Sequence, residues 1–202
     1  MQNITLDTIL VPVDFSDNSL NALDTAIAIA KRQKARLLLL HVFSTNPSII
    51  YPQLGLATDF VYAKFSEFPE KELQMRAEKI KEEHAVECRA FVVTGAICPV
   101  ITEQANTLKA DLIVMGTHGV SGFREFFMGS CAYAVLKNAP CPVLTIPAHH
   151  KWEHFKKILF PVRAMASAIE KYQVARSIIR KNKAELIVMG LIEIDSPTTF
   201  DS

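Results

Sequence analysis

The sequence has no apolar segment long enough to cross a membrane and no marked excess of charge of either sign. Its longest apolar runs, such as Leu37–Leu40 and Leu112–Met115, are of strand length, whereas a membrane-spanning helix needs about 20 apolar residues. The net charge of the 202 residues is +1, which gives no electrostatic bias toward nucleic acid or membrane surfaces. We therefore expect a globular protein that binds neither.

Two further signals are missing. The first residues lack the basic segment and apolar stretch of a secretory signal peptide. The cysteines are widely spaced, form no C-x-x-C pair, and are Cys88, Cys98, Cys131 and Cys141. This spacing favours reduced thiols over a disulfide framework or a zinc site. Both absences predict a cytoplasmic protein.

Strand and helix patterns alternate along the chain. Apolar, β-branched runs predict strands at Thr8–Val13, Arg36–Val42, Glu87–Val93, Asp111–Met115 and Pro142–Ile146. Helices are predicted after Ser16 and at Glu70–His84, Pro99–Leu108 and Ser130–Asn138. The strand runs are continuous rather than alternating, which is typical of a parallel sheet covered by helices on both faces. The pattern predicts an α/β fold with a doubly wound, five-stranded parallel sheet.

Ligands of such folds bind beyond the carboxyl ends of the strands, and two of these ends are unusual. Asp14 follows the first strand, and Gly116-Thr117-His118-Gly119 follows the fourth, with Gly129-Ser130 at the start of the next helix. Glycine allows the backbone to approach a ligand closely. A helix N-terminus supplies free N–H groups to a phosphate. The pattern therefore predicts a phosphate site at Gly116–Ser130.

Each feature also has a simpler interpretation. Two glycines can serve any turn from strand to helix, Asp14 can cap a helix, and His118 can face solvent in a turn. The combination carries more information than its parts. The strand at Asp111–Met115 is followed by the pattern G-x-x-G, nine further residues and G-S. This pattern resembles the ATP-binding signature of the universal stress protein family. Other segments that resemble this family are Ile9–Ser16, Leu39–Val42, Val93-x-Gly95 and Cys141–Leu144.

The resemblance covers roughly residues 5 to 147 and implies a sheet order of 3-2-1-4-5. It implies that Asp14 and the backbone of Val42 hold adenine and ribose, and that the phosphates are held by Gly116, His118, Gly119, Gly129 and Ser130. Pro12, Val13, Met115 and Cys131 would line the pocket. Cys131 departs from the Val or Thr usual there, and a thiolate stabilised by the helix start could sense oxidants. The alternative is a packed small side chain.

A shift of 149 residues aligns Ile9–Phe43 with Ile158–Ile192 without a gap, and several pairs are identical, among them Pro12 with Pro161 and Leu37 with Leu186. This internal repeat predicts three parts: a nucleotide-binding domain at residues 1–148, a linker at 149–155 and a partial second domain with β-α-β topology at 156–202. Arg163 replaces Asp14 in the second copy, so we expect one nucleotide site per chain.

Family dimers form through antiparallel pairing of their fifth strands, so the resemblance implies a homodimer through Val143–Ile146, an apolar edge open to pairing. The linker contains His149, His150 and His154. No third ligand is fixed near the i,i+4 pair, so a linker is favoured over a metal site.

Two classes of function remain. The resemblance implies a stress-response or regulatory module that binds ATP, with or without Mg²⁺, and hydrolyses it slowly or not at all. The alternatives are an enzyme of the related adenine nucleotide α-hydrolase superfold, either an ATP hydrolase or a nucleotidyl transferase, and a family member that has lost nucleotide binding. The sequence has neither the H-x-G-H nor the S-G-G-x-D-S motif of such enzymes and offers no evident catalytic base. The binding module is therefore preferred, with no catalytic residue assigned.

Overall fold

The computed structural model describes residues 5–44, 67–117, 128–148, 153–162 and 168–191. The chain separates into two compact units, Thr5–Glu153 and a smaller one from His154 onward. The predicted domain and linker boundaries stay predictions.

The larger unit contains one parallel sheet. Its strands are β1 (Thr8–Pro12), β2 (Arg36–Phe43), β3 (Cys88–Thr94), β4 (Leu112–Gly116) and β5 (Val143–Ile146), in the order β3-β2-β1-β4-β5. The predicted α/β class and strand order are confirmed. Leu10 of β1 lies between Leu38 of β2 and Ile113 of β4, so the centre of the sheet is apolar on both sides of β1.

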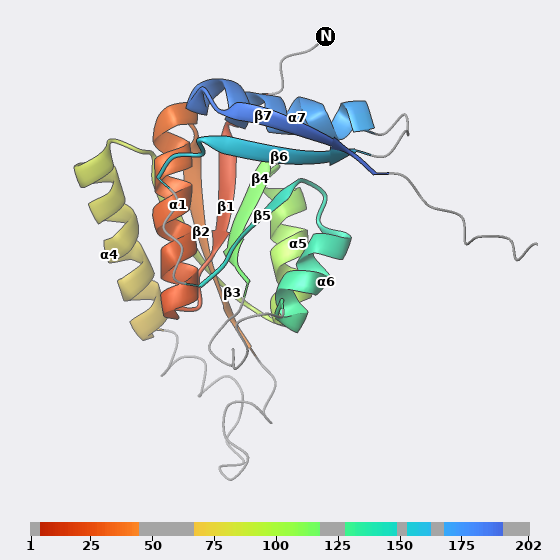
Figure 1. The fold of residues 1–202 in the computed structure, drawn as a ribbon. Helices are drawn as coiled ribbons and strands as arrows, with labels where there is room; N and C mark the ends of the chain where they lie inside the picture. The colour runs from red at the N-terminus through yellow and green to blue at the C-terminus, as the bar shows by residue number, and fades with distance from the viewer. Residues whose placement is uncertain (1–4, 45–66, 118–127, 149–152, 163–167, 192–202) are drawn as a thin grey trace, which may run out of the picture. The chain divides into compact units, whose positions relative to one another are not determined.

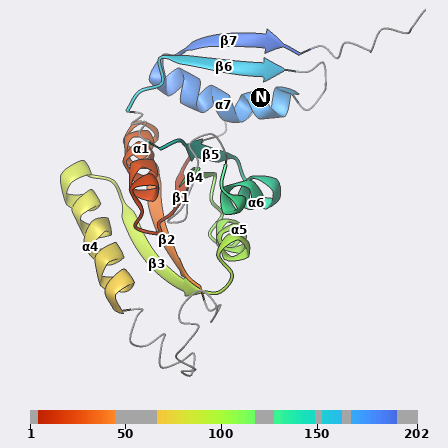
Figure 2. The same cartoon turned by 60° about the horizontal axis from the view of Figure 1, so that its bottom comes forward.

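Two helices cover each face of the sheet (Figure 1). Helices α1 (Asp17–Gln33) and α4 (Glu67–His84) lie on one face, and α5 (Ile97–Thr107) and α6 (Ser130–Asn138) lie on the other. The rotated view in Figure 2 shows the same layers. Among the helices that the structure describes, none is long and apolar enough to cross a membrane.

The predicted helix ends differ from the observed ones where a proline lies near the start. The sequence predicts a helix start at Pro99, whereas α5 begins at Ile97. It predicts another at Glu70, whereas α4 begins at Glu67, ahead of Pro69. Proline is tolerated throughout the first helical turn, because the N–H groups there have no acceptor within the helix. A proline therefore marks the first turn without fixing the first residue.

The core beneath α5 and α6 is built from leucines of the central strands. A cluster of buried residues joins the sheet to these two helices and consists of Leu10, Leu38, Leu40, Ile101, Ala105, Ala110, Ile113, Met115, Ala132 and Val135. Burial of such side chains contributes about 25 cal/mol for each Å² of apolar surface removed from water. This packing fixes the ends of β1, β2 and β4, from which the predicted site is built.

The smaller unit is a β-α-β segment made of β6 (Lys157–Val162), α7 (Ala168–Asn182) and β7 (Glu185–Gly190), with β6 parallel to β7. It agrees in detail with β1-α1-β2. Lys34 and Lys183, at the ends of the two helices, both have a positive φ, 60° and 51°. The hydrogen bond Ala35 N to Ala30 O also has a counterpart, Ala184 N to Ile179 O. That this unit is a partial second domain of the same family stays a prediction.

Candidate nucleotide site

Three strand ends and one helix start supply the predicted site. All five strands of the larger unit are parallel, so β1, β2 and β4 end at the same edge of the sheet. The turn that follows β1 carries Asp14, β2 ends with His41–Phe43, and β4 ends at Gly116. This edge is where doubly wound sheets place their ligands.

The turn after β1 is held by side chains around Asp14. Its Oδ1 accepts hydrogen bonds from Ser16 N at 3.0 Å and from Ser16 Oγ at 2.5 Å. Ser16 is the N-cap of α1, and its Oγ accepts from Ser19 N at 3.3 Å. The capping role that was open for Asp14 thus belongs to Ser16, and the Asp14 carboxylate supports the cap.

The segment before Asp14 is fixed to β2. Val13 N donates to Leu40 O at 2.8 Å, and the ring nitrogen Nδ1 of His41 lies 2.7 Å from Val13 O. Phe15 has φ 63°, a left-handed conformation that is strained for a residue with a side chain. Its ring lies 5.0 Å from the His41 ring, at 41° to it.

The other half of the site joins β4 to α6. Gly116 lies opposite Ile146 of β5, and Gly129 N donates to Thr117 O at 2.8 Å, which ties the helix start to the strand end. Gly129 is the N-cap of α6 and has no side chain to cap it. The first N–H groups of any helix have no acceptor within it. Ser130, which follows Gly129, is exposed.

The remaining predicted pocket residues lie around these two halves. Val13 and Met115 are buried, 2% and 6% exposed. Pro12, Val42 and Cys131 are half-buried, and Val42 and Cys131 pack against the core cluster under α5 and α6. The apolar side chains of these residues are suited to contact the flat faces of a nucleobase and ribose rather than their polar edges.

Cys131 does not have the stabilised thiolate that its place in the helix suggested. Burial raises the pKa of its thiol to about 12, and the Cys98 thiol and the Asp14 carboxylate act in the same direction. A helix start favours an anion, but here desolvation and two neighbours outweigh it. The oxidant-sensing hypothesis is therefore opposed by the structure, and the packed side chain is the better interpretation.

His118 and Gly119, the remaining predicted phosphate contacts, lie outside the described residues. Within the described part of the chain, no group of three or more His, Cys, Asp or Glu side chains is arranged to hold a metal ion.

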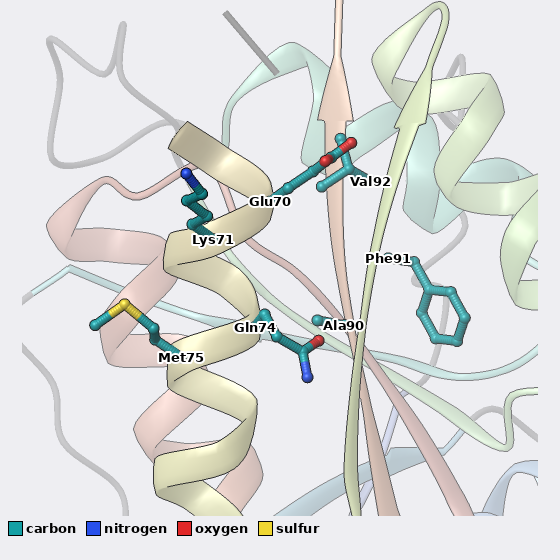
Figure 3. Close-up of a pocket in the computed structure, with 7 residues that line it drawn as sticks. All are labelled: Glu70, Lys71, Gln74, Met75, Ala90, Phe91 and Val92. Carbon is teal, nitrogen blue, oxygen red and sulfur yellow. The ribbon is translucent and has the colours of Figure 1, made fainter. Parts of the chain in front are cut away.

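Two hollows in the described residues are lined by other residues than those of the predicted site. One, of about 560 Å³, lies between α4 and β3 and is lined by Glu70, Lys71, Gln74, Met75, Ala90, Phe91 and Val92. Figure 3 shows Glu70 and Gln74 directed toward β3, and Phe91 on the far side of the strand. The other, of about 610 Å³, includes Thr8, Arg36 and Glu87 at the amino ends of the strands. Neither contains a predicted nucleotide contact.

Sequence reasoning did not assign a role to His41 or to Ser19. His41 is the one ionisable side chain between Leu37 and Phe43 in an otherwise apolar strand, and that interruption was the available signal. Its partner is the backbone carbonyl of Val13 in the turn after β1, which sequence alone does not identify.

Comparison with known proteins agrees with the fold and the motifs. Residues 5–147 match the profile of the universal stress protein family. Universal stress protein MJ0531 of Methanocaldococcus jannaschii is 38% identical over 141 residues, which cover 68% of this chain and 80% of that protein.

Solved structures share the architecture. A universal stress protein from Archaeoglobus fulgidus matches with a TM-score of 0.76 and 22% identity over 94% of this chain and 69% of its own. A universal stress protein solved in complex with cAMP matches with a TM-score of 0.50 and 27% identity, over 71% of this chain and 98% of its own. Since the family profile spans most of the chain and MJ0531 is similar over the same region, the chain belongs to the universal stress protein family.

Proposed function

We propose that the unit Thr5–Glu153 binds one adenine nucleotide, ATP with or without Mg²⁺, and acts as a regulatory module of the stress response. The observation that carries this proposal is the proximity of two halves of one site. The Asp14 carboxylate, bonded to Ser16, follows β1, and the start of α6 follows β4, which pairs directly with β1, so both halves lie at one edge of the sheet. A nucleotide needs such a pairing, because its ribose is bound by acceptors and its phosphates by N–H donors.

Each half is assigned one part of the ligand. Asp14 accepts hydrogen bonds from ribose hydroxyls, and the backbone at Val42 meets the adenine edge. The uncapped start of α6 at Gly129 and Ser130, with Gly116, His118 and Gly119, takes the phosphates. The family relative solved with cAMP, an adenine nucleotide, supports the choice of base.

The proposed role is to hold ATP, with slow hydrolysis or none. Phosphoryl transfer requires a positioned base or water and a cation that stabilises the transferred group. The described site residues supply a carboxylate that is already bonded to Ser16 and backbone N–H groups, which suit ground-state binding. Occupancy of the site would then report the ATP level to a partner protein.

Titration calorimetry with ATP, ADP and AMP tests the proposal on the full chain. In Gly119→Val the branched side chain should occlude the phosphates and weaken ATP binding by at least about 100-fold, or roughly 2.7 kcal/mol. Gly190→Val is the matched control, because a Cβ at Gly190 meets nothing within 4 Å. ATP affinity that is the same in Gly119→Val, Gly190→Val and wild type would misplace the site.

A further inference from the structure

His41 makes a hydrogen bond whose direction can be assigned. Its Nδ1 lies 2.7 Å from Val13 O, and a carbonyl oxygen can only accept. Nδ1 therefore carries the proton and donates, which fixes the ring tautomer in the neutral form and leaves Nε2 as the acceptor. The ring is half-buried, so this donor contributes more than a solvated one would.

The peptide group between Val13 and Asp14 is held at both of its polar ends. His41 donates to its carbonyl, and its N–H, that of Asp14, donates to Ser19 Oγ at 3.3 Å. Ser19 Oγ in turn donates to Ser16 O at 3.0 Å. Because the peptide plane is fixed from β2 and from α1, the direction in which the Asp14 side chain leaves the backbone is fixed as well.

The strained residue after Asp14 also contacts this histidine. Phe15 adopts φ 63°, and its ring contacts the His41 ring at 5.0 Å. Strained backbone persists only where its surroundings over-determine it, and such places concentrate at ligand sites. His41 thus contacts both neighbours of Asp14, one through a hydrogen bond and one through its ring.

The second copy of the β-α-β segment provides an independent comparison. At the shift of 149 residues Pro12 and Val13 are kept as Pro161 and Val162. The positions of the network residues Asp14, Phe15, Ser16, Ser19 and His41 hold Arg163, Ala164, Met165, Ala168 and Gly190. All five residues of the network are replaced together, although β6, α7 and β7 still form. The β-α-β fold therefore does not require this network, whereas a ligand site at Asp14 would.

We propose that His41 is a positioning residue of the nucleotide site, which orients Asp14 toward the ligand through the Val13 carbonyl. The inference rests on the proposed binding of ATP. It assigns His41 no contact with the nucleotide: the histidine acts through the backbone and through Asp14.

Two variants separate the donor from the ring. His41→Asn keeps an N–H donor near the position of Nδ1 and loses the ring, whereas His41→Phe keeps a ring against Phe15 and loses the donor. ATP affinity measured by calorimetry should fall by about tenfold or more in His41→Phe, the effect of losing one buried hydrogen bond. It should stay within about threefold of wild type in His41→Asn. The reverse order would overturn the inference, because it would mean that ring packing matters and the donor does not.

A double-mutant cycle tests whether His41 acts through Asp14. In an Asp14→Ala background, His41→Phe should cause no further loss of ATP affinity, since the group that it positions is gone. Equal losses in both backgrounds would show a general structural effect and contradict the proposal. Wild-type protein that does not bind ATP would defeat the proposed function together with this inference. Wild-type binding with an unaffected His41→Phe would defeat this inference alone.

The hydrogen bond itself is tested without a ligand and without a variant. The ¹⁵N spectrum of the imidazoles in the wild-type chain should show that the neutral form of the His41 ring carries its proton on Nδ1 and not on Nε2. The opposite tautomer would remove the donor on which the proposal depends, even if a His41 variant failed to fold.

Discussion

Cys131 shows how burial can oppose the effect of a helix start. It is the second residue of α6, where the helix dipole favours an anion. Its thiol is nevertheless half-buried and lies near the Cys98 thiol and the Asp14 carboxylate, which both disfavour a second negative charge. Its pKa is raised from 9.0 to about 12, so at neutral pH the thiol is protonated and a poor nucleophile.

Alkylation of the native chain should therefore be slow at Cys131. With iodoacetamide, followed by peptide mass spectrometry, the rate at Cys131 should keep rising up to a pH of about 12, whereas in the chain unfolded by guanidinium it should level off near the ordinary pKa of 9.0. A native rate at Cys131 that already levels off at or below pH 9 would contradict the predicted burial of this thiol.

Raised thiol pKa values also make the free energy of unfolding depend on pH. Burial also raises the pKa of the Cys88 thiol to about 12 and that of the Cys141 thiol to about 11. Between pH 9 and these values the unfolded chain has lost thiol protons that the folded chain keeps. The free energy of unfolding should therefore fall as the pH rises above about 9. Urea titrations at pH 8 and pH 10 measure it, and replacement of the three cysteines by serine should remove that part of the decrease.

Strand β5 lies at one edge of the sheet, and its hydrogen bonds with β4 show which of its backbone groups face the open side. Ile113 N bonds to Pro142 O and Thr117 N to Ile146 O, so alternate residues from 142 to 146 face β4, and Val143 and Thr145 face outward. An unpaired apolar edge invites pairing with another chain. We propose that two chains pair through β5.

Thr145→Pro tests this pairing, because it removes an outward N–H without removing a bond to β4. The wild-type chain should have the mass of a dimer by light scattering, and Thr145→Pro that of a monomer. Ala90→Pro is the matched control: it removes the same kind of group from the outer edge of β3, since Glu87 and its alternate neighbours face β2. A wild-type monomer, or equal dissociation of both variants, would argue against pairing through β5.

The elements themselves were largely predictable from sequence. Strands of a parallel sheet are covered by helices on both faces, so all their side chains must be apolar. Continuous apolar runs such as Leu37–Leu40, which are buried in the structure, are therefore easy to recognise in the sequence. Gly116 lies at the end of β4 and Gly129 and Ser130 at the start of α6, as the sequence predicts. The hydrogen bond from His41 to Val13 was not predictable, because it depends on the register between β1 and β2, in which Pro12 lies opposite Leu40. Sequence spacing does not encode such a bond between distant segments of the chain.

The two β-α-β segments place equivalent side chains in different surroundings. Leu10, Leu38 and Leu40 are 0%, 4% and 0% exposed beneath α5 and α6. Their equivalents Leu159, Ile187 and Met189 are 54%, 41% and 42% exposed. The smaller unit, as far as the structure describes it, has one helix, α7, and no counterparts of α5 and α6.

Leu10→Ala and Leu159→Ala should therefore differ in their effect on stability. The first leaves a cavity in a packed core and should lower the free energy of unfolding by about 2–5 kcal/mol. The second truncates a half-exposed side chain and should cost less than about 1 kcal/mol. Hydrogen exchange of peptides from β1 and β6 reports the two units separately. Equal losses would mean that the face around Leu159 is covered in solution.

A single nucleotide site per chain is the central expectation for the whole molecule. The larger unit has Asp14 and the Gly116–Ser130 segment, whereas the smaller has Arg163 in place of Asp14. Native mass spectrometry of the wild-type chain with saturating ATP counts the bound nucleotides directly. The account predicts one ATP per chain, lost in Gly119→Val; no bound ATP, or two per chain, would contradict it.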